Sequence, residues 1–199
     1  MSDYYSISDA FRDFVNDKIN INKYVDIDGR NYWNIICSAM DWLDVATYNL
    51  DNNSLSKIGL SESGYYHFEI SMIDLAIETI IQLHRGFSNK HNNPFTTEIF
   101  IEESNTITNE NDYYFIKTIR ACFASHPVNL KMKTELSLSE KFYASWSMIS
   151  HSDVLRVLLY PINSLESGFI TFDLHTRELY NFFEYGLSIL DDIKIMINK

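Results

Sequence analysis

Arg120 and His126 are the residues whose types and spacing best suit catalysis in this sequence. They lie in the segment RACFASHP, which ends at Pro127. A histidine can take up or release a proton near neutral pH, and an arginine can neutralise charge that develops on phosphate oxygens. A histidine held beside an arginine at a helix end is therefore a candidate phosphodiester site.

The helix that carries Arg120 determines whether the two side chains can meet. Apolar residues at helical spacing predict a helix over about 111–125. Six steps along an ideal α-helix rotate by about 240° and rise by about 9 Å, so both side chains could not share a face within it. Pro127 disfavours the α conformation at His126 and ends the helix there. The imidazole can then fold back toward the guanidinium.

This arrangement resembles the HEPN superfamily, the higher-eukaryote and prokaryote nucleotide-binding domains, over roughly residues 31–130. Members are compact helical bundles, commonly dimeric, in which an Arg is followed, after four to six residues, by a His near a helix end. The resemblance implies that two chains bring Arg120 and His126 together across a twofold axis. It also implies RNA cleavage without a metal or other cofactor, in which His126 activates or protonates a ribose oxygen and Arg120 steadies the scissile phosphate.

Two functions of different classes follow from these residues. The first is a HEPN-like homodimer with metal-independent endoribonuclease activity, of the toxin–antitoxin or phage-defence type. The alternative is a non-catalytic helical module that binds a protein partner or a small ligand. In that case Arg120 pairs with an internal carboxylate, His126 caps the helix C-terminus and a sizeable apolar patch is exposed.

Other combinations of polar residues are weaker candidates. Asp41 and Asp44 share one helix face and could oppose Asp74 and Glu78 around a divalent metal, but no Glu is followed by a His three residues later. Solvated faces are the better interpretation. The Arg-to-His spacing recurs at Arg85 and His91, and His84 and His91 flank a Gly-Phe pair, in a stretch expected to be a loop. We predict no metal site and no cofactor.

Hydrophobic periodicity predicts a mainly α fold, a four- or five-helix bundle with a small antiparallel β-hairpin in the C-terminal third. Ser8 or Asp9 should cap the first helix, and Gly86 should end the third. The expected helices span 8–19, 31–50, 63–83, 111–125 and 176–198. The second and third should pack antiparallel, and residues 87–111 should form a long surface loop. The hairpin pairs 153–162 with 168–174, and 142–149 could add a strand. We expect one domain over 1–199, with the hairpin inserted at about 152–174.

Charge and composition limit the partners. Sixteen Lys and Arg against 27 Asp and Glu give a net charge of −11, so binding of bulk DNA through the overall field is not expected. Lys131 and Lys133 form the densest basic stretch, interpreted as a solvated surface; a local basic site or a basic partner stays open. Apolar runs are shorter than the roughly 18 residues of a membrane helix, and the acidic N-terminus does not resemble a signal peptide. We expect a soluble, cytoplasmic protein.

Overall fold

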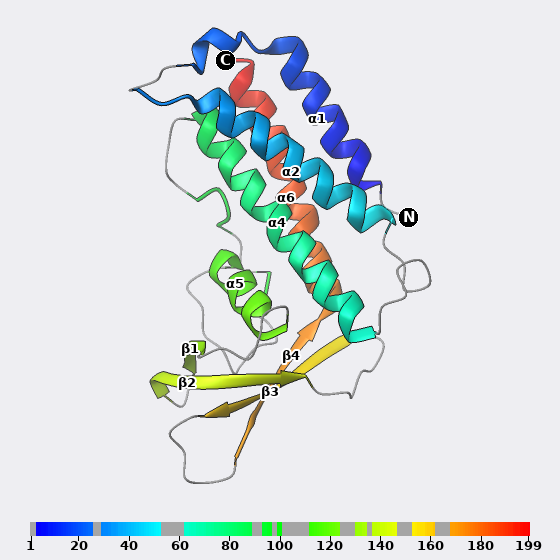
Figure 1. Ribbon diagram of the computed structural model, residues 1–199, viewed down its shortest axis with the longest axis vertical. Helices are drawn as coiled ribbons and strands as arrows, with labels where there is room; N and C mark the ends of the chain where they lie inside the picture. The colour runs from blue at the N-terminus through cyan, green and yellow to red at the C-terminus, as the bar shows by residue number, and fades with distance from the viewer. Residues whose placement is uncertain are drawn as a thin grey trace. The chain divides into compact units, whose positions relative to one another are not determined.

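The computed structural model describes residues 3–25, 29–52, 62–88, 93–96, 99–100, 112–123, 130–134, 137–146, 153–161 and 168–199. These residues form a mainly helical fold with a small antiparallel sheet in the C-terminal third, as the sequence predicts (Figure 1). The helices are α1 (Tyr4–Lys18), the short 3-10 helix η1 (Ile21–Lys23), α2 (Tyr32–Asn52), α4 (Glu62–Ser88), α5 (Asp112–Phe123) and α6 (Thr176–Ile197). The strands are β1 (Leu130–Thr134), β2 (Ser137–Trp146), β3 (Val154–Pro161) and β4 (Ile170–His175).

The chain divides into two compact units, which are described separately. The helical unit comprises Met1–Gly59, Met72–Pro94 and Phe183–Lys199, and the sheet unit comprises Leu60–Ser71 and Phe95–Phe182. Helices α4 and α6 therefore each contribute residues to both units. The expectation of a single domain stays a prediction. None of the helices in the described ranges combines the length and the apolar character needed to cross a lipid bilayer.

In the helical unit, α1 and α2 pack beside the C-terminal parts of α4 and α6 (Figure 1). Helices α2 and α4 run antiparallel, as expected from the sequence. Their apolar stripes meet in a core because each stripe repeats with the period of the helix. The fully buried side chains of this core include Phe11, Val15, Ile36, Leu43, Ile77, Ile80, Leu83, Leu190 and Ile193.

Helix α1 begins before the predicted start. Asp3 is its N-cap, and the Asp3 carboxylate accepts a hydrogen bond from the backbone N–H of Ser6 at 3.0 Å. The Asp51 carboxylate, near the end of α2, accepts from the N–H groups of Tyr4 at 3.1 Å and Tyr5 at 2.7 Å. The first turn of α1 therefore has acceptors from its own cap and from a neighbouring helix, which local periodicity could not reveal.

The predicted cap at Ser8 or Asp9 is wrong, because both residues lie inside α1. The Ser8 side chain is buried, and its hydroxyl lies 2.8 Å from the hydroxyl of Thr47 in α2. The Thr47 hydroxyl in turn donates a hydrogen bond to the backbone carbonyl of Leu43 at 2.9 Å. In the contact between Ser8 and Thr47, either hydroxyl can be the donor. Ser8 therefore forms a hydrogen bond between α1 and α2 and does not cap a helix.

Gly86 does not end α4, which continues to Ser88. A Cβ atom at Gly86 would lie 2.7 Å from Cγ1 of Ile36 in α2. The glycine is therefore explained by close packing of two helices and not by a helix cap. Phe87, expected in a loop, lies in α4, and its ring packs edge-on against Phe11 and Tyr24.

In the sheet unit, the four strands form an antiparallel sheet in the order β1-β2-β3-β4. The predicted hairpin corresponds to β3 and β4, and β2 adds the third strand that the sequence allowed. Leu155, Val157 and Leu159 of β3 are buried at alternate positions, as expected for a sheet with one covered face. Arg156 lies between two of these buried residues, so its side chain points to the opposite face of the sheet. There it forms a two-pronged ion pair with Asp173, its direct partner in β4.

Strand β1 was not predicted. It contains Lys131 and Lys133, which the charge pattern had assigned to a solvated surface. β1 pairs with β2, with Leu130 opposite Phe142 and Lys131 opposite Lys141. The strand is only five residues long and apolar and charged residues alternate in it, so its signal is too short to stand out against the surrounding polar sequence.

The long segment 87–111 contributes buried side chains where it is described. Phe95 and Phe100 are buried, and both rings pack against Phe182 of α6 at centroid distances of 5.3 and 5.1 Å. The buried carboxylate of Asp112, the first residue of α5, accepts hydrogen bonds from the backbone N–H groups of Ile99 and Phe100. The expectation of a surface loop is therefore wrong for these positions.

Candidate functional site

Arg120 lies in the last turn of α5, and its side chain is exposed. The helix turns its apolar residues inward, where the rings of Phe115 and Phe123 pack against Phe172 of β4 at centroid distances of 5.8 and 5.5 Å. Because Ile119 is part of this buried stripe, the next residue, Arg120, is directed outward. His126 lies outside the described residues, so its distance from Arg120 stays undefined.

The outer face of α5 consists of Tyr113, Tyr114, Lys117 and Arg120. The Lys117 ammonium lies 5.4 Å from the centroid of the Tyr113 ring, within the range of a cation–π interaction. The Tyr113 and Tyr114 rings lie 5.3 Å apart, and Tyr114 is 51% exposed. Asp112 is the one acidic residue in the α5 sequence, and its carboxylate binds backbone N–H groups in the interior. This face combines two cations with two aromatic rings.

Such a combination suits a single-stranded nucleic acid. Guanidinium and ammonium groups bind phosphate, and exposed aromatic rings stack on unpaired bases. The sequence indicated Arg120 as a candidate. The structure adds Lys117 and the half-buried Tyr113 beside it.

Neither cysteine has the environment of a reactive nucleophile. Cys122 is buried in α5, and burial raises the pKa of its thiol to about 12. Burial also raises the pKa of the half-buried Cys37, with a further contribution from the Asp41 charge that Arg12 opposes. Both thiols therefore stay protonated near neutral pH, whereas the attacking species of a catalytic cysteine is the thiolate.

Asp41 and Asp44 bind an arginine. Arg12 of α1 places Nε 2.6 Å from an oxygen of Asp44 and a terminal nitrogen 2.8 Å from an oxygen of Asp41. Burial alone would lower the pKa of Arg12, but the hydrogen bonds and negative charges of both aspartates raise it. The two carboxylates thus join α2 to α1. The interpretation as solvated faces is wrong for Asp44, whose side chain is only 19% exposed, and for Asp74, which is buried. In the described part of the chain, no group of three or more His, Cys, Asp and Glu is placed to hold a metal ion.

A buried carboxylate in the sheet unit was missed by the sequence analysis. Glu69 of α4 is 3% exposed, and the Tyr180 hydroxyl donates a hydrogen bond to it at 2.6 Å. The Tyr65 hydroxyl, one turn earlier in α4, is also hydrogen-bonded to Glu69. Burial raises the pKa of Glu69, and the two phenols partly oppose that shift. The spacing of Tyr65 and Glu69 could have indicated a pair, but nothing local pointed to Tyr180.

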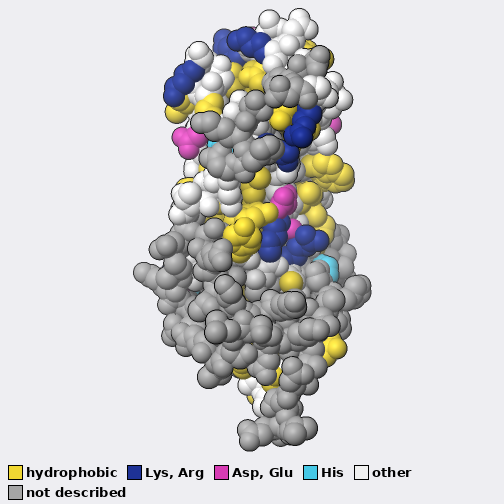
Figure 2. Space-filling model, turned by 90° about the vertical axis from the view of Figure 1, so that its left-hand side faces the viewer, with side chains coloured by type: hydrophobic (Ala, Val, Ile, Leu, Met, Phe, Trp, Pro, Cys, Tyr) yellow, Lys and Arg dark blue, Asp and Glu magenta, His cyan; other side chains and the backbone are white. Residues whose placement is uncertain are grey.

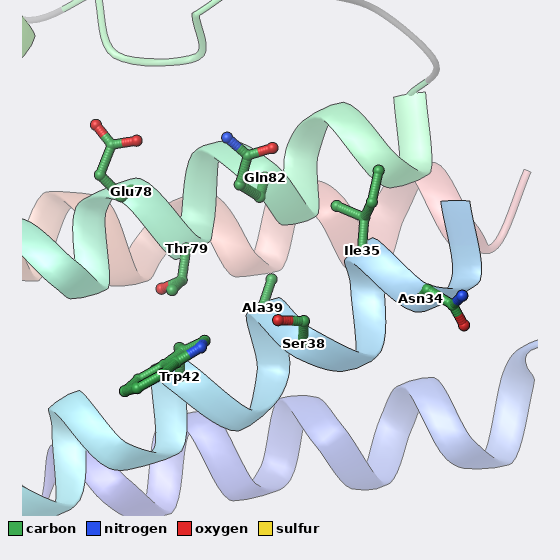
Figure 3. Close-up of a pocket in the computed structure, with 8 residues that line it drawn as sticks. All are labelled: Asn34, Ile35, Ser38, Ala39, Trp42, Glu78, Thr79 and Gln82. Carbon is green, nitrogen blue, oxygen red and sulfur yellow. The ribbon is translucent and has the colours of Figure 1, made fainter. Parts of the chain in front are cut away.

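A groove of about 340 Å³ lies between α2 and α4 in the helical unit (Figure 3). It is lined by Asn34, Ile35, Ser38, Ala39, Trp42, Glu78, Thr79 and Gln82. Thr79 points from α4 toward α2 above Trp42, and Ala39 and Ser38 project from α2 between the helices. Glu78 and Gln82 extend from α4 on the side away from Trp42. The sequence predicted the two helices but could not show the groove between them, because the groove depends on how they pack.

Apolar exposure continues along α2 beyond the groove. Trp42 is 52% exposed, and Val45 and Tyr48 on the following turns are 42% and 54% exposed. The Tyr5 ring packs edge-on against Tyr48 at a centroid distance of 5.6 Å. We call Trp42, Val45, Tyr48 and Tyr5 the α2 patch.

The second pair with the Arg-to-His spacing is Arg85 and His91, which the sequence analysis placed in a loop. Arg85 belongs to α4, as does His84, and His91 lies outside the described residues. Nε of Arg85 and Nδ1 of His84 are buried without a hydrogen-bond partner. The expectation of a loop at 84 and 85 is wrong because α4 continues through the close contact at Gly86.

Among the described residues of the face shown in Figure 2, Lys and Arg occur in small separate groups, and the group in the middle of that face lies beside Asp or Glu side chains. This distribution agrees with the net charge of −11. Comparisons of the chain with protein-family models, curated proteins and solved structures find no match.

Proposed function

We propose that this protein is a HEPN-like, metal-independent endoribonuclease whose catalytic residues are Arg120 and His126. The observation that carries the proposal is the exposed position of Arg120 in the last turn of α5, on a face that also holds Lys117 and two tyrosines. An outward guanidinium with a cationic and aromatic surrounding is suited to phosphate.

The chemistry follows from the two side chains. Neutral His126 takes the proton of a ribose 2′-hydroxyl, and the 2′-oxygen attacks the adjacent phosphorus. A bond forms between O2′ and phosphorus while the bond from phosphorus to O5′ breaks, and the leaving oxygen takes a proton from a second imidazole or from water. Arg120 stabilises the negative charge that builds up on the non-bridging oxygens. The products are a 2′,3′-cyclic phosphate and a 5′-hydroxyl.

The resemblance supplies the second imidazole from a second chain. In a homodimer, two Arg120 and two His126 side chains would meet across a twofold axis, so that one His acts as base and the other as acid. A toxin or phage-defence effector with this activity would cut single-stranded RNA. The tyrosines of the outer α5 face would hold unpaired bases, since stacking on aromatic rings is the usual means of binding single strands.

The test is cleavage of a fluorescently labelled single-stranded RNA in the presence of EDTA. We expect Arg120→Ala and His126→Ala each to lower the cleavage rate by at least about 100-fold, because each removes a group that acts in the transition state. Arg177→Ala, which removes another exposed arginine of the sheet unit, is the matched control and should leave the rate unchanged. Cleavage at an unchanged rate in both variants, or no cleavage by the wild-type protein, overturns the proposal.

A further inference from the structure

We infer that Lys117 is a positioning residue of the proposed site and binds a phosphate of single-stranded RNA that neighbours the phosphate at Arg120. The inference rests on the proposed function, because it takes the strand at Arg120 to be the substrate. It adds a second cation that holds the strand and takes no part in the chemical step. The ring of Tyr113 keeps the Lys117 side chain in place for this contact.

Lys117 and Arg120 lie on the same side of α5. They are three residues apart, so they occupy adjoining turns of one helix face with Cβ atoms about 5–6 Å apart. Arg120 is exposed and Lys117 is half-buried. Ile116 and Ile119, each one position earlier, are fully buried. Both cations are therefore directed away from the core, where one strand can contact the two of them.

The Tyr113 ring orients the Lys117 side chain. The Lys117 ammonium lies 5.4 Å from the centroid of this ring, which belongs to the preceding turn of α5. An ammonium has three N–H donors, so contact with a ring still allows hydrogen bonds to phosphate oxygens. A lysine side chain loses conformational freedom when it binds a ligand. Because the ring already restricts Lys117, less freedom remains to be lost when a phosphate binds.

The charges of α5 favour a polyanion on this face. Asp112 is the one acidic residue in the α5 sequence, and its buried carboxylate accepts hydrogen bonds from backbone N–H groups. Lys117 and Arg120 are thus the charges that α5 itself directs outward. The net charge of −11 provides no general attraction for RNA, so we expect each direct phosphate contact to matter for affinity.

The two cations suit different phosphates. A planar guanidinium can bind two oxygens at once, which suits Arg120 to the scissile phosphate, where negative charge builds up. An ammonium acts as a point charge, which is sufficient for a phosphate whose charge does not change in the reaction. Lys117 would then bind the substrate and the transition state equally well. Loss of such a contact raises KM and leaves kcat unchanged.

The experiment measures binding separately from cleavage. A fluorescently labelled single-stranded RNA with 2′-O-methyl groups cannot be cut by attack of a 2′-hydroxyl, and its binding is followed by anisotropy over a series of salt concentrations. We expect Lys117→Ala to weaken binding by about 10-fold, as for a hydrogen bond to a charged group. The slope of log affinity against log salt should become shallower by about 0.7, the value for one phosphate contact on a single strand.

Cleavage of the unmodified RNA in EDTA gives the second readout. Lys117→Ala should raise KM by a similar factor and change kcat by less than about 2-fold, whereas Arg120→Ala lowers kcat. Lys117→Arg keeps the charge and should restore both binding and KM. Tyr113→Leu should weaken binding less in the Lys117→Ala variant than in the wild type, because part of its effect acts through Lys117.

Lys23→Ala is the matched control. It removes an exposed ammonium from η1 in the helical unit and changes the net charge by the same amount, so affinity, salt slope and KM should stay at their wild-type values. Circular dichroism confirms that the variants are folded. An equal loss in Lys23→Ala and Lys117→Ala would overturn the inference, because the effect would then come from net charge alone.

The remaining outcomes separate the inference from the proposed function. Unchanged binding and an unchanged salt slope in Lys117→Ala overturn the inference, as does a fall in kcat with KM unchanged. A wild-type protein that binds the strand through Lys117 but does not cut unmodified RNA overturns the proposed function and supports the phosphate contact. No binding by the wild type overturns both.

Discussion

Glu69 shows how a single buried group can influence the protein without being part of the proposed site. Its carboxylate lies in the interior of the sheet unit with two phenol hydroxyls as hydrogen-bond donors. Burial penalises the charged form, and the hydrogen bonds from Tyr65 and Tyr180 stabilise it. Burial has the larger effect, so the pKa of Glu69 lies above its ordinary value of 4.5.

This raised pKa predicts how stability depends on pH. The folded protein holds the Glu69 proton more tightly than the unfolded chain, so the resulting stabilisation is complete below pH 4.5 and is lost as pH rises through the folded-state pKa. Glu69→Gln cannot titrate. The free energy of unfolding of the wild type, relative to Glu69→Gln, should therefore fall as the pH rises above 4.5 and then level off. Urea denaturation between pH 4 and pH 8 measures this difference.

Tyr180→Phe is the companion variant. It removes the hydroxyl that donates to Glu69 and keeps the ring, so we expect a loss of about 1 kcal/mol in the free energy of unfolding, the typical contribution of one hydrogen bond. Parallel pH profiles for the wild type and Glu69→Gln would contradict the raised pKa.

At the scale of elements, the close approach of α2 and α4 depends on a glycine. Gly86 lies inside α4 with its α-carbon facing Ile36, and a methyl group there would meet Cγ1 of Ile36 at 2.7 Å. Replacing an exposed Gly in a helix interior with Ala usually raises the free energy of unfolding of the protein. Here the expected sign is reversed, because the two helices would have to separate or Ile36 would have to leave its rotamer.

Gly86→Ala should lower the free energy of unfolding by about 1–3 kcal/mol, as typical for overpacking in a core. Ile36→Ala should itself be destabilising, because it opens a cavity, but it removes the atom that clashes. The double variant should then be no less stable than Ile36→Ala, and a double-mutant cycle by urea denaturation measures this coupling. Gly168→Ala is the control, since nothing lies within 4 Å of a Cβ there. Additive losses would contradict the proposed contact.

At the scale of the whole molecule, the nuclease proposal requires two chains. Each chain has a mass of 23.3 kDa and a net charge of −11, so association needs a surface on which like charges do not meet. We predict a solution mass of twice 23.3 kDa by light scattering at physiological salt. A monomer over a wide concentration range would remove the composite site.

The candidate site was only partly predictable. The sequence pointed to Arg120 through residue type and its spacing from His126, and the structure adds that the Arg120 side chain is exposed. The same reasoning could not identify the Arg12 partner of Asp41 and Asp44, or the Tyr180 partner of Glu69, because these residues lie far apart in the chain. Nor could it show the groove beside Trp42, which requires the facing surface of α4.

By itself the sequence determined the mainly helical class, the five principal helices and the β3–β4 hairpin, because hydrophobic periodicity is a local property that burial imposes on each element. Only the tertiary structure decided that α1 begins at Tyr4, that α4 passes through Gly86 and that Phe95 and Phe100 are buried. Each of these depends on a group from a distant segment: a carboxylate at Asp51, a side chain at Ile36, a ring at Phe182. Contacts between distant segments have no local period, and so the pattern along the chain does not contain them.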